Sequence, residues 1–329
     1  MIVAVDSGTT STRAWVLDDG EVKASSGSRG GARDLVHTKD RSELLGRVRR
    51  LADDALASAG ATWDGIEAVV AFGMITSELG LEEVPHLEAP VSCRTLAGAM
   101  LERSYADALP APVHLVPGVR SGGDDLELAD FMRGEETEVA GLLAVGEPEP
   151  PLLYISTGSH TKFVRLDPEG QIDWSLTTLS GELLLALHRE TILAELIDLE
   201  APVSDFAMLE DGARFVERAG LTRALFAARL LNRLRGVSPT SCSDFLHGAV
   251  AGADVLSLRR AAETRGGFPD RIAIGGKGSL KEAYRHLLER QRGVAELRAF
   301  DVPLGALGAW KLFTTEREAA PAGAPEGGS

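Results

Sequence analysis

The chain has 329 residues, of which 44% are hydrophobic and 25% charged. These are the proportions of ordinary globular proteins, and the length favours about two domains. The formal charge of −15 and the lack of a basic block argue against nucleic acid as a partner. No apolar run is long enough to span a membrane, so we expect no membrane partner.

The N-terminus begins directly with an apolar segment and has no basic region before it, so we expect no signal peptide. Cys93 and Cys242 are far apart in the sequence and have no metal-binding spacing. Two reduced thiols are typical of a cytoplasmic protein, which is the location we predict.

Residues 1–25 predict three strands joined by two turns. The strands are IVAVD (2–6), RAWVL (13–17) and EVKAS (21–25). Segment 7–12 (SGTTST) is a turn of glycine and hydroxyl residues, and Asp-Gly within 18–20 indicates a tight hairpin.

The same order returns about 150 residues later. Segments 151–156, 162–167 and 171–176 are again strand-like, and TGSHT (157–161) is again a turn of glycine and hydroxyls. This repeat predicts two similarly built α/β halves, which we place at 1–145 and 146–318. The Pro/Gly/Ala-rich tail, 319–329, is expected to be disordered.

Apolar spacing predicts the remaining elements. Helices are expected near 40–60, 94–108, 181–198, 212–235, 243–264, 279–291 and 303–316, and the last of these could pack back on the first half. A buried strand is expected at 67–73, an edge strand at 86–92, a strand or extended segment at 111–118, and a strand followed by a glycine loop within 271–278. Ser279 and Glu282 have the spacing of a capping box.

The first turn follows a predicted strand that ends in a carboxylate. Asp6 could hold hydrated Mg²⁺, and Gly8 allows close approach of a ligand to the backbone. Phosphate oxygens could be bound by the backbone N–H groups and hydroxyls of Ser7, Thr9, Thr10 and Ser11, with Arg13 adding a charge. A plain hairpin turn with a surface aspartate is the alternative.

Two further glycine segments suggest a nucleotide. The second turn comprises Thr157, Gly158, Ser159, His160 and Thr161. With the first turn it could hold opposite sides of a polyphosphate. Gly275, Gly276 and Lys277 follow a predicted buried strand and precede a helix, an arrangement that favours a nucleobase or ribose; a structural tight turn is the alternative.

Segment 133–138 (RGEETE) could provide a general base and a substrate clamp. Arg133 precedes the adjacent carboxylates Glu135 and Glu136, and phosphoryl transfer to an alcohol needs a carboxylate to accept the hydroxyl proton. An acidic helix start is the alternative. Arg94 and Lys162 could meet a substrate carboxylate or be ordinary surface charges.

Several motifs in order resemble one family. They are segments 2–17, 71–80, 115–119, 131–141, 153–164, 179–184, 243–255 and 272–280. The chain resembles the sugar-kinase/actin/Hsp70 ATPase superfold and, more narrowly, the 2-dehydro-3-deoxygalactonokinase family. RGEET and the G-[ST]-H-x-K turn are the family-specific parts.

The resemblance implies an α/β fold of two ribonuclease-H-like (actin-like ATPase) domains, each with a mixed central sheet, and an interdomain cleft. It implies phosphorylation of the 6-hydroxyl of 2-dehydro-3-deoxy-D-galactonate by ATP with Mg²⁺, in galactonate breakdown. Glu135 would be the base, with Glu136 second. Gly275 and Gly276 would border the adenosine, and the loop after Met74, which includes Ser77, would shape the sugar pocket.

The loop after Met74 and residues 158–163 differ from the family's pattern, so a kinase of another sugar, keto-deoxy acid or polyol stays an alternative. A non-enzymatic actin-like nucleotide-binding protein is another. The expected partner is a small sugar acid, and a homodimer is left open.

Overall fold

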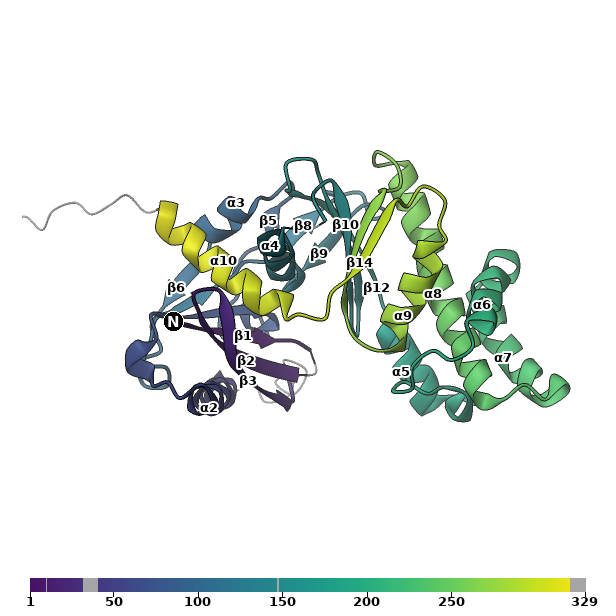
Figure 1. Cartoon of the computed structure of the whole chain (residues 1–329), viewed down its shortest axis with the longest axis horizontal. Coiled ribbons are helices and arrows are strands. Elements are labelled where there is room, and N and C mark those ends of the chain that lie inside the picture. Colours follow the sequence, from purple (N-terminus) through teal and green to yellow (C-terminus); the bar gives the residue numbers. More distant parts are fainter. Residues whose placement is uncertain (10, 32–40, 147, 320–329) are drawn as a thin grey trace, which may run out of the picture. The chain divides into compact units, whose positions relative to one another are not determined.

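The computed structural model describes residues 1–9, 11–31, 41–146 and 148–319 and divides into two compact units (Figure 1). The first unit comprises residues 1–147, 170–173 and 302–329, and the second comprises 148–169 and 174–301. The boundary expected between residues 145 and 146 lies close to the point where the chain passes from the first unit to the second. Within the described part of the chain, no helix combines the length and apolarity needed to cross a membrane.

The first unit is built on a mixed sheet with the strand order β3-β2-β1-β4-β7-β6. The strands are β1 (Ile2–Ser7), β2 (Ser11–Asp18), β3 (Glu21–Arg29), β4 (Ala68–Gly73), β6 (Leu101–Arg103) and β7 (Val113–Leu115). β1 and β2 are antiparallel, whereas β1, β4 and β7 run parallel. The carboxyl ends of β1 and β4 therefore lie at one edge of the sheet.

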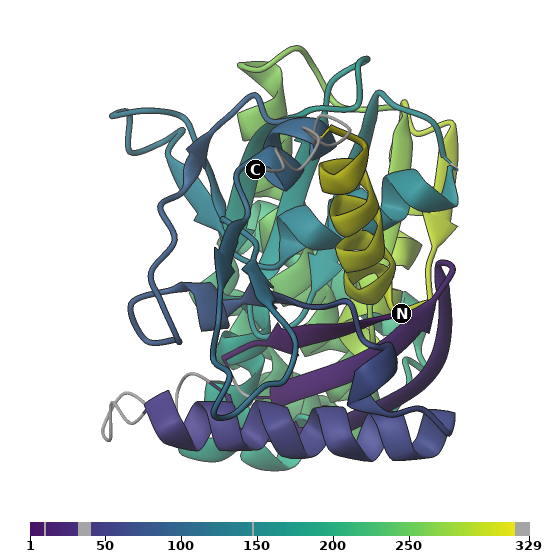
Figure 2. The ribbon, with the colours of Figure 1, turned by 90° about the vertical axis from the view of Figure 1, so that its left-hand side faces the viewer.

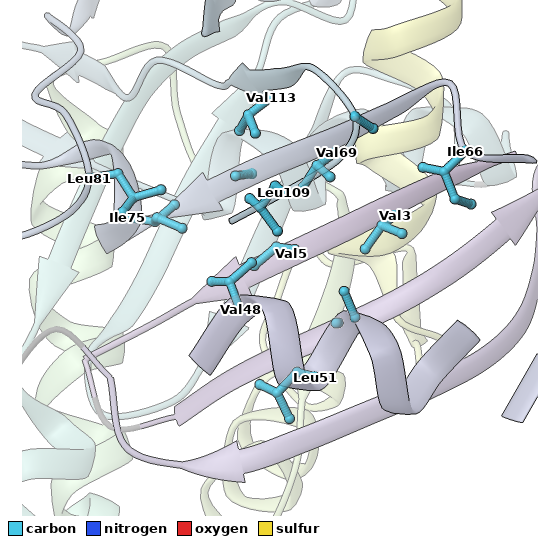
Figure 3. Close-up of a cluster of buried hydrophobic side chains, with 14 of the residues drawn as sticks. Val3, Val5, Val48, Leu51, Ile66, Val69, Ile75, Leu81, Leu109 and Val113 are labelled. Atoms are coloured by element: carbon cyan, nitrogen blue, oxygen red, sulfur yellow. The ribbon is translucent and has the colours of Figure 1, made fainter. Parts of the chain in front are cut away.

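Alternating side chains of β1 are buried on opposite faces of this sheet, because every second residue of a strand points the same way. Val3 and Val5 pack with Val48 and Leu51 of α2 (Arg41–Ala59), in a cluster that also includes Val69 (Figure 3). Helix α2 covers this face of the sheet (Figure 2).

Helices α4 (Glu135–Val145) and α10 (Leu304–Ala319) pack closely against each other through glycines. A Cβ on Gly308 would lie 1.7 Å from the carbonyl oxygen of Thr137, and one on Gly141 would lie 1.9 Å from that of Leu304. These glycines allow the two backbones to approach to a distance that no side chain would permit. The C-terminal helix thus supports α4 within the first unit.

The second unit repeats the arrangement, with the strand order β12-β11-β10-β13-β14. Its strands are β10 (Leu152–Thr157), β11 (Thr161–Leu166), β12 (Ile172–Thr178), β13 (Arg271–Gly276) and β14 (Glu296–Ala299). β10 pairs antiparallel with β11 and parallel with β13. Its helices are α5 (Ser180–Glu190), α6 (Phe206–Ala219), α7 (Leu221–Arg235), α8 (Pro239–Glu263) and α9 (Ser279–Glu289).

The two sheets have the same topology: three antiparallel strands, followed by parallel strands next to the first of them. The predicted fold class, α/β with a mixed central sheet in each half, is therefore confirmed. The elements not yet named include helix α3 (Cys93–Gly98) and a small sheet of β5 (Leu87–Glu88), β8 (Val119–Ser121) and β9 (Asp130–Met132). Short 3₁₀ turns lie at Trp63–Gly65, Met74–Thr76 and Ala194–Leu196.

Three expected helices end early or are divided. The helix expected at 94–108 is wrong beyond Gly98, because residues 101–103 pair with β7 as strand β6. The helix expected at 181–198 ends at Glu190. The expected helix 212–235 is two helices separated by Gly220, whose φ of +80° lies outside the helical region.

Two smaller expectations also change. The capping box at Ser279 does not form: Gly278 is the cap residue, the Glu282 carboxylate accepts from the Val203 N–H, and Ser279 Oγ has no partner among the described residues. The strand expected at 86–92 is limited to Leu87–Glu88 in the small sheet. Of the tail predicted to be disordered, only Ala319, the end of α10, lies within the described residues.

Candidate functional site

The edge where β1 and β4 end brings a carboxylate next to two glycines. Asp6 is half-buried near the end of β1, and its neighbour Ser7 pairs with Gly73 at the end of β4. Gly73 has a φ of +82°, and a Cβ there would lie 3.1 Å from Asp6 Oδ1. A Cβ on Gly134 would in turn lie 3.4 Å from the Cα of Gly73. Glycine at these two positions leaves the Asp6 carboxylate uncovered by side chains from either one.

Burial raises the pKa of Asp6 to about 6, an effect that Arg13 opposes and Glu135 reinforces. Two carboxylates that influence each other in this way disfavour simultaneous ionisation. The structure therefore brings together Asp6 and Glu135, which are far apart in the sequence.

The adjacent carboxylates Glu135 and Glu136 have different surroundings. Glu136 is fully buried, and both of its carboxylate oxygens accept from the Gly134 N–H at 2.8 Å. Thr137 Oγ1 donates a third hydrogen bond at 3.1 Å. Burial, and next the charge of Glu135, raises the pKa of Glu136 to about 8. Glu135 is half-buried, so it is the more accessible carboxylate of the two.

Arg133 lies immediately before these residues and is held by neutral groups. Its Nη1 donates to Thr76 Oγ1 at 3.1 Å and its Nη2 to the Val84 carbonyl at 2.6 Å, with His86 Nδ1 at 3.4 Å. Burial lowers the pKa of Arg133, against the opposing charges of Glu136 and Glu83. Among the described residues, no carboxylate forms an ion pair with it. A fixed cation without an ion-pair partner is suited to an anionic ligand.

The first turn is closed by a hydrogen bond from the Gly8 N–H to the Ser11 carbonyl at 2.9 Å. Gly31 packs directly on it: a Cβ there would lie 2.2 Å from the Gly8 carbonyl oxygen. Ser7 is fully buried, with its Oγ 3.4 Å from Thr12 Oγ1. Gly8, Thr9 and Ser11 are half-buried and Arg13 is exposed, while Thr10 lies outside the described residues.

The second unit has an equivalent edge, where β10 and β13 end. Thr157 pairs with Gly276, which has a φ of +88°. A Cβ on Gly276 would lie 2.3 Å from the Thr157 carbonyl oxygen. Thr157 Oγ1 donates to the Gly275 carbonyl at 3.0 Å, and Lys277 is exposed. The backbone at 275–276 therefore passes directly over the end of β10.

The second turn rests on the start of α5. A Cβ on Gly181 would lie 2.0 Å from the Gly158 carbonyl oxygen, and the Glu182 N–H donates to the Ser159 carbonyl at 2.9 Å. His160 Nε2 lies 3.8 Å from the Glu182 carboxylate. Like the first turn, this turn is packed against a glycine from a later segment.

The remaining predicted substrate residues are placed differently. Lys162 is buried and donates to Thr177 within the second sheet. Ser77 is buried and its Oγ donates to the Met74 carbonyl at 2.7 Å, while Met74 is half-buried and Arg94 is exposed on α3. Residues that the sequence did not single out are Gly73, Thr76 and His86. Only Gly73 had a usable signal, since it is the last residue of a predicted buried strand.

The family model described as DGOK, 2-keto-3-deoxy-galactonokinase, matches residues 6–306. The chain belongs to this family. A crystal structure of a Sinorhizobium meliloti protein assigned as a 2-dehydro-3-deoxygalactonokinase is 26% identical, with 98% of this chain and 100% of that chain covered and a TM-score of 0.75. The search of curated proteins found no match.

Two less similar structures show the fold alone. They are component A of (R)-2-hydroxyglutaryl-CoA dehydratase from Acidaminococcus fermentans and the activator of 2-hydroxyisocaproyl-CoA dehydratase from Clostridium difficile. The first is 17% identical, and the match covers 97% of this chain and 98% of that chain. The second is 15% identical, and the match covers 99% of each chain. Both have a TM-score of 0.53. The family match and the Sinorhizobium meliloti structure support an ATP-dependent carbohydrate kinase that acts on a sugar acid, and the predicted family and enzyme class are confirmed.

Proposed function

We propose that the kinase transfers the terminal phosphoryl group of ATP to the 6-hydroxyl of 2-keto-3-deoxy-galactonate, with Glu135 as the base. The observation on which this rests is the convergence of Asp6, Gly73 and Glu135 at one edge of the first sheet. In parallel sheets, ligands bind at the carboxyl ends of the strands. Glu136 is buried and fixes the start of α4, so we assign it a structural role and leave the proton transfer to Glu135.

The residues at this edge fit Mg²⁺. Asp6 supplies a hard oxygen ligand. The negative charges of Asp6 and Glu135 repel each other, and a divalent cation bound nearby would reduce this repulsion. Mg²⁺, when bound, would neutralise the charge of the transferring phosphoryl group. Asp6 would hold it, and the glycine at position 73 leaves room beside the carboxylate.

The two glycine-backed turns are suited to phosphate oxygens. Each turn has its carbonyls packed against another backbone, Gly31 in the first turn and Gly181 in the second. Backbone N–H groups held in this way can donate to an anion without reorganisation. A protein with the same fold, the 2-hydroxyisocaproyl-CoA dehydratase activator, has bound ADPNP. We assign residues 7–11 and 157–161 to the phosphates and Gly275, Gly276 and Lys277 to the nucleoside.

Glu135 would accept the proton of the sugar hydroxyl as that oxygen bonds to phosphorus. The Glu136 carboxylate accepts from the Gly134 N–H and so fixes the start of α4, and this holds the Glu135 side chain in place. Arg133 would bind the carboxylate of the sugar acid with its remaining N–H groups, since Thr76 and Val84 fix its orientation. The base and the anion clamp are therefore two residues apart.

Glu135→Gln tests the assignment of the base. Kcat should fall about 10²-fold or more, because the amide cannot accept the proton, while ADP still binds. Glu138→Gln is the matched control: this glutamate is in the same helical turn, with its Cγ 3.9 Å from the Cβ position of Gly305 in α10. A coupled ADP-release assay gives kcat, and near-parental turnover in Glu135→Gln would refute the assignment.

Arg133→Lys tests the anion clamp. The KM for the sugar acid should rise about tenfold, because lysine keeps the charge but loses the planar fork of donors. Turnover of a neutral polyol, measured at high concentration, should respond much less. Equal changes for the acid and the polyol would remove Arg133 from carboxylate recognition.

A further inference from the structure

The second unit contains a buried carboxylate that the proposed reaction does not use. Asp254 lies in α8 and is 7% exposed. Its Oδ2 accepts from Thr178 Oγ1 at 2.8 Å and also from the hydroxyls of Ser180 and Tyr284. Among the described residues, no lysine, arginine or histidine forms an ion pair with it. The hydrogen-bond partners of Oδ2 are therefore three neutral hydroxyl groups.

A buried carboxylate of this kind is costly, and burial raises its pKa. An apolar residue in place of Asp254 would fill the same space without this desolvation cost. We therefore look for a role of Asp254 beyond packing. Buried polar networks in which every member has a partner fix one geometry, and that property is useful next to a binding site.

Two of the three donors connect Asp254 to the second turn. Ser180 begins α5, and the next two residues contact the turn: Gly181 packs on the Gly158 carbonyl and the Glu182 N–H donates to Ser159. Tyr284, which is fully buried in α9, has its Oη 3.3 Å from Thr161 Oγ1 at the end of the same turn. Asp254 thus contacts groups on both sides of the turn.

We infer that Asp254 is a positioning residue that fixes the second turn through Ser180 and Tyr284. This inference rests on the proposed role of residues 157–161 in binding the phosphates of ATP. Tyr284 is fully buried and Asp254 nearly so, and the hydrogen bonds of both lead to the turn, so they act on the nucleotide through the turn. The three hydroxyl donors hold the start of α5 and the start of β11 at a fixed distance, which keeps the turn's N–H groups aligned before ATP arrives.

The same helix offers a matched control. Asp244 is also buried in α8, at 4% exposed, and its Oδ2 accepts from Ser204 Oγ at 3.0 Å and from the N–H groups of Ser204 and Asp205 at 3.2 and 2.7 Å. These partners belong to the loop before α6, not to the second turn. Asp244→Asn therefore disturbs a comparable buried network that has no contact with residues 157–161.

The experiment measures KM for ATP, KM for the sugar acid, kcat and Tm in the full-length Asp254→Asn, Tyr284→Phe and Asp244→Asn variants. Asp254→Asn should raise the KM for ATP about tenfold, since small misplacements of binding groups are costly, with the KM for the sugar acid nearly unchanged. Tyr284→Phe, which removes only a hydroxyl, should shift the same constant in the same direction. Asp244→Asn should lower Tm and leave the ratio of the two KM values as it was.

An unchanged KM for ATP in both Asp254→Asn and Tyr284→Phe would overturn the inference, as would an equal rise in Asp244→Asn. If Asp254→Asn does not fold, Tyr284→Phe decides. Gly181→Ala separates this failure from failure of the proposed function, because a Cβ there would lie 2.0 Å from the Gly158 carbonyl oxygen and would displace the turn itself. If Gly181→Ala raises the KM for ATP and the other variants do not, only the positioning role is lost. If Gly181→Ala has no effect, the second turn does not bind ATP and both assignments are lost.

Discussion

The two units end corresponding strands in the same way but with different chemistry. In the first unit, Ser7 of β1 pairs with Gly73, and in the second, Thr157 of β10 pairs with Gly276. The residue before the pair is Asp6 in one unit and Ser156 in the other. The backbone frame is therefore repeated, while the carboxylate is found at only one of these two strand ends. Under the proposed assignments, the first unit would supply the acid–base and metal chemistry and the second mainly backbone and hydroxyl donors.

The turns are also supported differently. Beneath the first turn, Ser7 and Thr12 form neutral contacts, and Thr12 donates to the Gly30 carbonyl at 2.9 Å. The second turn is supported by the network of Asp254, in which a carboxyl group is bound by three hydroxyls. The same topology thus permits two solutions for holding a turn, one with neutral hydroxyls and one with a buried carboxylate.

The largest expected effect is on kcat, and it distinguishes Asp6 from Ser156, the corresponding residue of the second unit. Asp6→Asn should lower kcat about 10²–10³-fold, because an amide is a poor ligand for Mg²⁺ and does not compensate the charge in the transition state. Ser156→Ala should cost less than about tenfold, as expected for loss of one hydroxyl. ADP release at several Mg²⁺ concentrations measures both. If the two variants lose similar activity, the chemistry is shared between the units and the comparison fails.

The buried carboxylate of the first unit gives a pH prediction. The pKa of Glu136 is raised from 4.5 to about 8, so above pH 4.5 the folded state retains a proton that the unfolded state releases, and stability falls as the pH rises. Glu136→Gln lacks this proton. Its unfolding free energy relative to the parent should therefore rise by about 2 kcal/mol between pH 5 and pH 7. Urea unfolding at both pH values gives the difference, and a pH-independent difference would show that Glu136 is ionised in the folded protein.

The smallest expected difference distinguishes Gly73→Ala from Gly276→Ala. Both glycines have nearly the same φ, +82° and +88°, so the backbone strain is matched. The added Cβ would lie 2.8 Å from the nearest carbonyl oxygen in the first variant and 2.3 Å in the second. Gly276→Ala should therefore lose about 1 kcal/mol more stability, by overpacking. Thermal unfolding measures this difference. A larger loss of stability in Gly73→Ala would contradict the view that Gly73 and Gly276 occupy equivalent positions at the ends of β4 and β13.

Strands with local signals were predictable. The apolar run 2–6 and its repeat at 151–156 gave the central strands of both sheets, because buried parallel strands are continuously apolar. β6 was missed, since its strand character comes from pairing with β7, and nothing in residues 101–103 shows that partner. Gly220 divides α6 from α7 by its conformation, although a glycine within a helical pattern is often tolerated.

The individual candidate residues of the site could be predicted from the sequence, but their arrangement in space could not. Asp6 and Glu135 could each be chosen from the local motif, yet their proximity depends on β4 and α4, which the motifs do not describe. Glu135 and Glu136 were equivalent in the sequence. Successive helical residues point about 100° apart, so the two side chains have different surroundings, and only the packing of α4 shows that Glu136 is the buried one. Arg133 was found by its neighbours, whereas its partners Thr76 and His86 had no signal.

The glycine contacts between α4 and α10 have a consequence for biosynthesis. Among the described elements α10 is the last to leave the ribosome, yet it packs against the helix that begins with Glu135. The first unit is therefore discontinuous in the chain, and its earliest strands must wait for residues 302–319 before their core is complete. A nascent chain released before that point would lack the support for its proposed base, so translation itself delays assembly of this part of the first unit until the second unit has been made.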